Sequence, residues 1–302
     1  MTSGPIVFDR AAVRRNLRRA EKLGAATFLI DRAAEDLCER LGAVLRRFER
    51  AVDLASPTDA VRRRLRGAHL VSTIVAVTDR AGADLSARGD DPSIVADAEA
   101  LPLREDSLDL VVSALALQFV NDLPGTFVQV RRALKPDGLF LAALIGGDSL
   151  IELRQAFAAA EAELEHGASP HVAPFADVRA IGMLLQRAGF ALPVTDVDRL
   201  SVRYASPFAL MQDLRRMGAT NALTERRRMP LKRGSLLRMA EIYAERFSDR
   251  DGRVRATFDI VWLSGWKPHA SQQQPLSPGS AKARLADALG TREVPAGDKA
   301  GR

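Results

Sequence analysis

The sequence predicts an α/β fold in which helices cover a mostly parallel, doubly wound sheet. Two apolar runs, Leu108–Val112 and Leu139–Leu144, have almost no polar interruption and are typical of strands buried on both faces. A segment with helical spacing lies between them and ends at Lys135–Gly138. A strand, a helix and a strand in this order form a right-handed crossover, and ligands bind at the carboxyl ends of such strands.

The other elements are expected in order along the chain. Residues 9–50 carry apolar positions at three-to-four spacing and predict a helix-rich segment. Apolar or β-branched runs predict strands at 50–54, 72–78 and 94–96, and Thr58 is placed to cap a helix that follows the first of them. Gly146–Ser149 opens another helix, and a helix over 178–188 ends at Gly189. Two late strands, 194–204 and 256–265, enclose a basic helical insertion.

These elements predict three parts. An N-terminal helical segment (1–50) precedes the main α/β domain (51–269), which carries a helical cap insertion around 205–248. Residues 270–302 are rich in Ser, Gln, Pro and Gly and are predicted to be a disordered tail.

Composition predicts a globular protein without a membrane span. The chain of 302 residues is 47% hydrophobic and 27% charged, and it contains no apolar run of about 18 residues. Its single cysteine, Cys38, excludes an internal disulfide framework and favours a reducing compartment. The Arg-rich N-terminus has no apolar stretch of a secretory signal and is interrupted by Asp9 and Glu21, so we expect a cytoplasmic location.

The positive charge is concentrated in residues 203–238. This segment holds nine Lys or Arg residues against Asp213 and Glu225. Few aromatic side chains accompany them and no nucleic-acid module is recognisable, so we expect no nucleic-acid partner. Two interpretations stay open: a solvated basic face, or a docking surface for an acidic protein or carrier.

Acidic residues follow two of the predicted strands and indicate a nucleoside site. Asp79 is placed to accept hydrogen bonds from ribose hydroxyls, and Asp97 with Ala98 is placed to contact an adenine edge. The loop after Asp53 lacks the glycines that would let a ligand approach its backbone closely, and Ala55 stands at one of these positions. The four histidines show no metal-ligand spacing, so no metal is expected.

Longer motifs resemble a known family. Asp97–Pro102 and Ser107–Ser113 resemble the core of class I S-adenosylmethionine-dependent methyltransferases, of the type 11 group related to the biotin-pathway malonyl-carrier-protein methyltransferase. Other segments resemble a narrower subgroup, the bacterial relatives of mitochondrial respiratory complex I assembly factor 5. They are Phe8–Arg10, Val120–Pro124, Leu134–Gly138, Gly146–Leu150, Glu152–Arg154, Ser169–His171, Leu210–Leu214, Met217–Gly218 and Ile260–Lys267.

The resemblance implies a seven-stranded Rossmann-like sheet with a helical cap, and S-adenosylmethionine as cofactor. Carried over by position, the cofactor-binding residues are Asp53, Ala55, Ser56, Asp79, Asp97, Ala98 and Ser113. The substrate-side residues are Gln118, Asn121 and His171. Two positions depart from the family pattern: the loop Asp53–Asp59 lacks all three glycines, and Gln118-Phe119 replaces the usual His-Trp pair.

The implied function is modification of a protein substrate, with a subunit of respiratory complex I (NADH dehydrogenase) as the expected partner. The mitochondrial member of the subgroup is linked to arginine hydroxylation rather than to methylation. Methyl transfer requires mainly positioning, so the sequence identifies no catalytic residue. Two alternatives stay open: a malonyl-carrier-protein or small-molecule methyltransferase, and a non-catalytic assembly chaperone with a degenerate cofactor loop.

Overall fold

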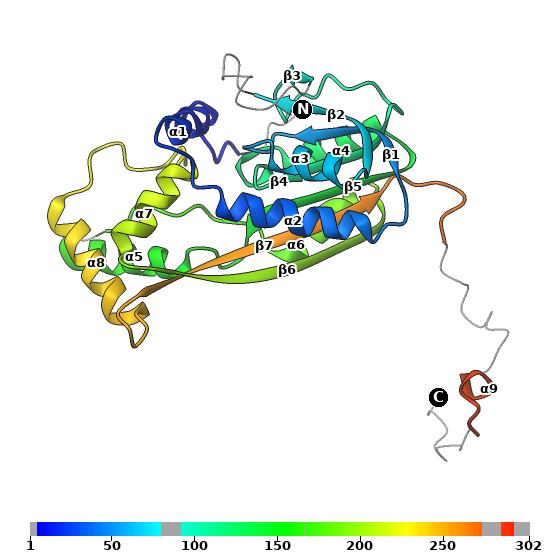
Figure 1. Cartoon of the computed structure of the whole chain (residues 1–302). Coiled ribbons are helices and arrows are strands. Elements are labelled where there is room, and N and C mark those ends of the chain that lie inside the picture. The colour runs from blue at the N-terminus through cyan, green and yellow to red at the C-terminus, as the bar shows by residue number, and fades with distance from the viewer. Residues whose placement is uncertain (1–4, 80–91, 166, 274–284, 293–302) are drawn as a thin grey trace, which may run out of the picture. The chain divides into compact units, whose positions relative to one another are not determined.

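A single mixed sheet organises the protein. The computed structural model describes residues 5–79, 92–165, 167–273 and 285–292. Within these residues, seven strands are ordered β3-β2-β1-β4-β5-β7-β6 (Figure 1), which confirms the α/β fold and the seven-stranded sheet. The strands are β1 (Phe48–Leu54), β2 (Val71–Thr78), β3 (Ser93–Val95), β4 (Leu108–Ala114), β5 (Leu134–Gly146), β6 (Ala191–Tyr204) and β7 (Val254–Trp266).

Strands β1 to β5 run parallel to one another, whereas β7 runs antiparallel to both of its neighbours. β1 pairs with β2 and with β4, β2 pairs with β3, and β4 pairs with β5, all in parallel. β7 pairs antiparallel with β5 and with β6. The carboxyl ends of β1, β2, β3 and β4 therefore meet at one edge of the sheet, where a ligand site is expected.

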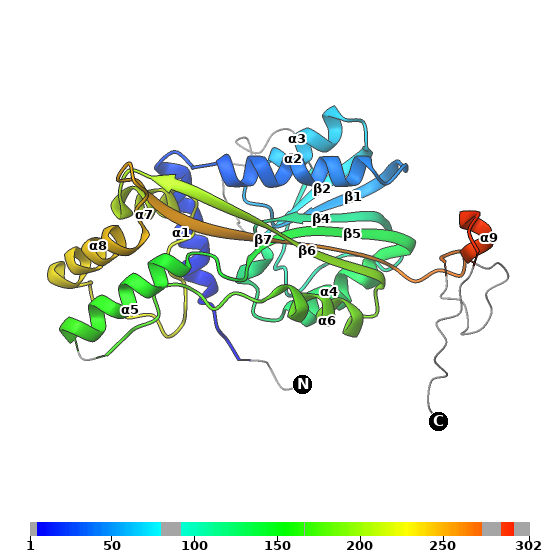
Figure 2. The same cartoon turned by 90° about the horizontal axis from the view of Figure 1, so that it is seen from below.

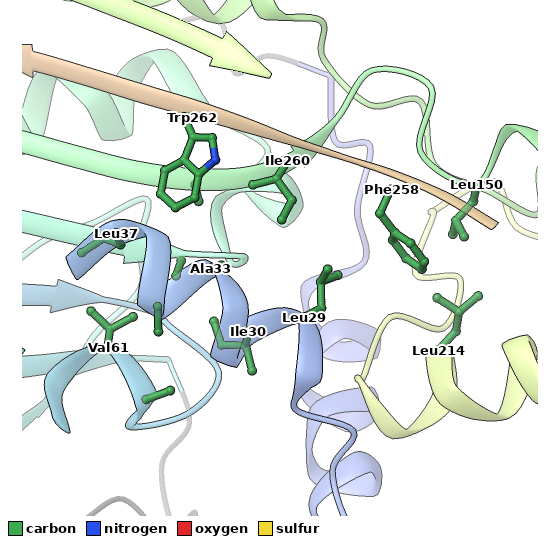
Figure 3. Packing of buried hydrophobic residues seen from close by; sticks show 14 of the residues in the cluster. Leu29, Ile30, Ala33, Leu37, Val61, Leu150, Leu214, Phe258, Ile260 and Trp262 are labelled. Atoms are coloured by element: carbon green, nitrogen blue, oxygen red, sulfur yellow. The ribbon is translucent and has the colours of Figure 1, made fainter. Parts of the chain in front are cut away.

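Alternating side chains of the central strands build two separate cores. Leu110 and Val112 point into a core that includes helix residues such as Leu37, whereas Val111 points into a core that includes Phe127. Helices α2 (Phe28–Gly42) and α3 (Ala60–Gly67) cover the first face; α4 (Leu123–Ala133) and α6 (Val178–Arg187) cover the other (Figure 2). Figure 3 shows Leu37 beside Trp262 of β7, which is 1% exposed. The near-continuous apolar runs of the sequence thus reflect burial on both faces.

A helical cap adjoins the extended halves of β6 and β7 (Figure 1). It contains α5 (Ile151–Glu165), α7 (Pro207–Arg216) and α8 (Arg233–Phe247), of which α5 packs against α8. Helix α1 (Arg10–Lys22) contacts α7 and so belongs with the cap, whereas α2 lies on the sheet. Helices α7 and α8 lie in the region 205–248, where the sequence predicts a helical cap insertion.

Most predicted element boundaries agree with the structure to within a few residues. β5 begins earlier than expected, because Leu134 already pairs with Leu108. The predicted turn at Lys135–Gly138 is an irregularity inside this strand, with Asp137 at φ 63°. Gly189 has φ 82° and follows α6, as a glycine that ends a helix does.

The C-terminal residues form a separate unit. Contacts between Cα atoms divide the chain into residues 1–268 and 269–302. The predicted disorder of 270–302 falls mostly outside the described residues; α9 (Leu285–Leu289) is a short helix within this unit. In the part of the chain that the structure describes, no helix is long and apolar enough to cross a membrane.

Candidate cofactor and substrate site

One cavity of about 310 Å³ lies at the carboxyl edge of the sheet. Ala55 after β1, Asp79 after β2 and Ala98 after β3 line it. Gln118, in the short helical turn Leu117–Phe119 after β4, and His171 line the same cavity. Segments far apart in the sequence are thus brought together as expected for a ligand site of this fold.

Three other predicted residues are buried next to the cavity and do not line it. Asp53, Ser56 and Ser113 are at most 4% exposed. Ser56 Oγ donates a hydrogen bond to Asp53 and accepts one from the Ala114 backbone at 3.0 Å. Ser113 Oγ donates to the Leu54 carbonyl at 2.7 Å. Their side chains therefore fix the loop after β1 rather than face a ligand.

The acid at the end of β1 has a partner that the sequence did not reveal. Arg62 of α3 lies 2.5 Å from Asp53, and both residues are 1% exposed. Burial raises the pKa of the Asp53 carboxyl, and the guanidinium of Arg62 opposes this effect. Arg62 is one of three consecutive arginines, so no local signal distinguishes it from its neighbours.

Ala55 adopts the backbone conformation that the missing glycine would provide. Its φ is 61°, in the left-handed region, where an L-residue with a Cβ costs about 1–2 kcal/mol. The backbone N–H of Ala55 donates to Val77 at 2.7 Å, which ties the loop to the neighbouring strand. The loop therefore keeps its shape without glycine, with one added methyl group at the cavity wall.

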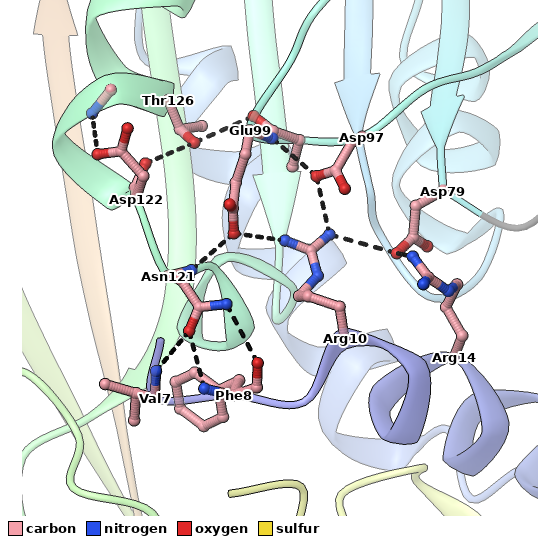
Figure 4. Close-up of polar contacts among 12 residues, drawn as sticks. Val7, Phe8, Arg10, Arg14, Asp79, Asp97, Glu99, Asn121, Asp122 and Thr126 are labelled. Atoms are coloured by element: carbon pink, nitrogen blue, oxygen red, sulfur yellow. Dashed lines mark hydrogen bonds and ion pairs between the residues drawn. The ribbon is translucent and has the colours of Figure 1, made fainter. Parts of the chain in front are cut away.

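The two acids predicted to hold a nucleoside are bridged by an arginine of α1 (Figure 4). Arg10 Nη2 lies 3.3 Å from Asp79 Oδ2 and 3.0 Å from Asp97 Oδ1. Its Nη1 donates to Glu99 at 2.7 Å. Sequence reasoning missed both Arg10 and Glu99, because residues 10 and 99 are neighbours only after the chain has folded.

Asn121 forms hydrogen bonds with the backbone of the N-terminal segment. Its Oδ1 accepts hydrogen bonds from the backbone N–H groups of Val7 at 2.9 Å and Phe8 at 2.8 Å, and its Nδ2 donates to the Phe8 carbonyl at 3.1 Å (Figure 4). The Phe8 ring meets Phe119 edge to face, with 5.6 Å between centroids. Asn121 is not among the cavity-lining residues, and its amide is used to hold this segment across the end of β4.

Gln118 presents a buried acceptor at the cavity. Its Nε2 donates to the Leu115 carbonyl at 2.8 Å. Its Oε1 is buried and has no hydrogen-bond partner among the described residues. Because an unpaired buried carbonyl is costly, this atom fits a donor group of a bound ligand.

A histidine and a buried glutamate form a pair at the far wall of the cavity. His171 Nε2 lies 2.7 Å from Glu161, which also accepts from the backbone N–H of Ser169 at 2.6 Å. Burial alone would raise the pKa of Glu161, but the hydrogen bonds from Ser169 and His171 outweigh it and lower the pKa. An ionised carboxylate only accepts hydrogen bonds, so Nε2 of His171 is the donor of the hydrogen bond to Glu161.

The wall around His171 is largely apolar. The His171 ring stacks on Phe157 at 3.9 Å between centroids. Apolar residues that line the same cavity include Leu150, Leu153, Val172, Phe175, Met211, Leu214 and Phe258. We refer to these residues with Phe157 and His171 as the apolar chamber. Among the described residues no group of three or more His, Cys, Asp or Glu side chains is placed to hold a metal ion.

Several arginines of the basic segment 203–238 are paired within the molecule. Arg226 lies 2.8 Å from Asp9, Arg227 lies 2.6 Å from Glu165 and Arg238 lies 2.7 Å from Glu163. Arg226 therefore joins the segment to the start of α1, and Arg227 and Arg238 join it to α5 within the cap. These three arginines fit neither predicted interpretation, because each pairs with an acid of the same chain instead of lying free on a solvated face or a docking surface.

Comparison with known proteins identifies similar sequences. Residues 52–142, from β1 to β5, match the family model of a methyltransferase domain. The chain is 37% identical over 294 residues to "Arginine-hydroxylase NDUFAF5, mitochondrial" of Danio rerio, covering 94% of this chain and 90% of that protein. Its human counterpart is 46% identical over 189 residues, which cover 63% of this chain and 54% of the human protein, so this match spans about half of the human relative.

Two further comparisons concern methyltransferases and the fold. The chain is 36% identical over 293 residues to a malonyl-(acyl-carrier protein) O-methyltransferase of a Methylovorus species, covering 92% of this chain and 96% of that protein. Among solved structures, the YcgJ protein from Bacillus subtilis aligns with a TM-score of 0.52 at 14% identity, over 78% of this chain and 99% of that one. At this low identity, the structural match supports the fold alone.

Proposed function

Because the chain belongs to the class I methyltransferase family that includes the arginine-hydroxylase NDUFAF5 and malonyl-(acyl-carrier protein) O-methyltransferases, we propose that it uses S-adenosylmethionine to modify a protein side chain during assembly of respiratory complex I. One observation carries this proposal. The cavity that Ala55, Asp79 and Ala98 line at consecutive strand ends is also lined by the residues of the apolar chamber. We assign the first group to the nucleoside of the cofactor and the second to a substrate side chain.

The residues at the strand ends have distinct roles in this proposal. Asp79 would accept hydrogen bonds from the ribose hydroxyls, and Asp97 with Ala98 would contact the adenine edge. Ala55 would bring the loop backbone to the cofactor, on the support of Asp53, Ser56 and Ser113. The bound cofactor supplies an activated methyl group on its sulfonium, so the main contribution of the protein is to position the acceptor.

On the substrate side, the acceptors support a substrate that carries N–H or O–H groups. Gln118 Oε1 and His171 Nδ1 would accept hydrogen bonds from such a group. Glu161 would hold the imidazole in the tautomer that leaves Nδ1 unprotonated. Asn121 would act indirectly, by holding the N-terminal segment next to the site.

The test is transfer to complex I subunits. The purified chain is incubated with methyl-labelled S-adenosylmethionine and separately with each subunit, and the products are read by mass spectrometry. A gain of one labelled methyl group in place of a hydrogen supports methylation. A parallel incubation supplied with dioxygen and a two-electron reductant tests the hydroxylation named for NDUFAF5, which adds one oxygen to the subunit while the second oxygen atom leaves as water. His171→Phe should lose transfer while Phe175→Leu, a change at the same chamber, should retain it. Loss in neither variant would contradict the assigned substrate side.

A malonyl carrier is the second candidate substrate. Arg215 and Arg216 line the cavity, and a guanidinium there could bind the free carboxylate of a malonyl group. The same assay with malonyl-carrier protein distinguishes the two, since a carrier methyltransferase would form a methyl ester on the acyl group and leave complex I subunits unlabelled.

A non-catalytic assembly chaperone is the third candidate. The loop without glycines favours it, because Ala55 adds a methyl group to the wall of the cavity. Under this alternative neither S-adenosylmethionine nor S-adenosylhomocysteine would bind in calorimetric titration. The cytoplasmic location stays a prediction, since the animal relatives are named mitochondrial.

A further inference from the structure

The position of Arg10 bears directly on how the nucleoside end of the cavity is used. The Arg10 side chain is 17% exposed and makes ion pairs with Asp79, Asp97 and Glu99 (Figure 4). Burial by itself lowers the pKa of the guanidinium, but the carboxylates of Asp97 and Asp79 outweigh it and raise the pKa. The observed ion pairs therefore stabilise the guanidinium, even though burial partly removes this cation from water.

Several contacts hold Arg10 in this place. Asp9 caps α1 by accepting from the Ala12 backbone at 3.0 Å, and Arg226 lies 2.8 Å from the same carboxylate. Just before Asp9, the backbone N–H groups of Val7 and Phe8 donate hydrogen bonds to Asn121. These contacts hold the start of α1 in place, in an orientation that lets Arg10 reach the acids.

A nucleoside cannot be clasped by these acids in the observed arrangement. One nitrogen of Arg10 lies within 3.3 Å of a carboxylate oxygen of each of Asp79 and Asp97. The ribose hydroxyls and the exocyclic amino group of adenosine stand at opposite ends of the molecule, so acids that bind both ends must lie a nucleoside length apart. Arg10 occupies the space between the two acids.

We propose that Arg10 is an internal competitor of the cofactor: its guanidinium and the adenosine compete for Asp79 and Asp97. The inference rests on the proposed use of S-adenosylmethionine and adds a residue that sets the affinity for it. Cofactor binding requires Arg10 to leave the two acids, and the first turn of α1 moves with it. When the cofactor is scarce, Arg10 therefore occupies the two acids.

Calorimetric titration with S-adenosylhomocysteine tests the competition. This probe lacks the sulfonium charge, so a change in affinity does not simply report the charge removed from the protein. We expect Arg10→Gln to bind the probe about tenfold tighter than the native chain, since displacement of a charge-assisted contact is no longer required. Arg14→Gln is the matched control: it removes the same charge from the same helix, and among the described acids Arg14 forms an ion pair with Asp79 alone, at 3.6 Å. Its affinity should stay within about twofold of native.

A second measurement does not depend on a variant. Hydrogen exchange of the amides at residues 10–14 is followed in the native chain with and without saturating S-adenosylhomocysteine. Faster exchange on binding is expected, because Arg10 is displaced and the first turn loosens. Unchanged or slower exchange, or native-like affinity of Arg10→Gln when the native chain binds, would overturn the competition and leave the cofactor proposal standing. No binding to any of the three proteins would contradict the cofactor proposal itself.

Discussion

Asp53 and Arg62 form an ion pair of 2.5 Å whose side chains are 0% and 2% exposed. The acid lies at the carboxyl end of β1 and the arginine in the first turn of α3, so the pair joins the two elements on either side of the loop that lines the cavity. Removing one partner would leave the other charge buried without compensation.

We therefore expect Arg62→Met to lower the free energy of unfolding by about 3–5 kcal/mol. Arg63→Met is the control, because Arg63 lies on the same helix but its side chain is 66% exposed. Its effect should stay below about 0.5 kcal/mol. Urea denaturation measures both, and equal effects of the two changes would contradict the structural role of the buried pair.

The left-handed backbone at residue 55 gives a second prediction. Ala55→Gly should leave the free energy of unfolding within about 1 kcal/mol of native, since relief of the positive φ is offset by greater freedom of the unfolded chain. Ala55→Val should be destabilising, because a β-branched residue is poorly tolerated in this region. Ala25→Val, at an exposed position without a positive φ, serves as control in thermal unfolding. A neutral Ala55→Val would show that the loop rearranges without cost.

Acid should loosen the cap through Glu165. A hydrogen bond from Ser235, together with Arg227 and Lys232, lowers the pKa of Glu165 from 4.5 to about 2. Because the folded pKa is depressed, this stabilisation is fully present above about pH 4.5 and is lost as the pH falls towards 2.

Glu165→Gln should therefore destabilise the protein near neutral pH and flatten the fall of stability with acid. Urea midpoints across the acid range measure the slope. Glu245→Gln changes another acid of the cap that is 62% exposed, and its slope should match the native one. A native slope in Glu165→Gln would assign the acid sensitivity to other carboxylates.

Charge reversal within the basic segment should separate a structural arginine from a surface one. Arg226 pairs with Asp9 and donates to the Leu223 carbonyl at 2.6 Å. Arg226→Glu would set two carboxylates against each other at the start of α1, so we expect a lower Tm. Arg228 is exposed, and Arg228→Glu should keep the native Tm. A Tm that falls equally in both variants would argue for a general effect of charge rather than for the pair with Asp9.

The sequence by itself determined the sheet and the positions of its ligand edge. Runs such as Leu108–Val112 predict a strand buried on both faces, and Asp79 and Asp97 lie at strand ends whatever the packing around them. These are local properties, because a strand and the residue after it are set by neighbours in the chain. The lost glycine was also visible, although its consequence, φ 61° at Ala55, was not.

Only the tertiary structure decided which charges meet. The chain has 44 Lys and Arg residues, and nothing local marks Arg10 as the partner of Asp79 and Asp97, or Arg62 as the partner of Asp53. His171 likewise acquires Glu161 only through the packing of the loop against α5. Side-chain pairing at a site depends on which elements the fold brings within a few ångströms. The packed core sets the distances between these side chains. It also excludes water, which strengthens the attraction between the paired charges.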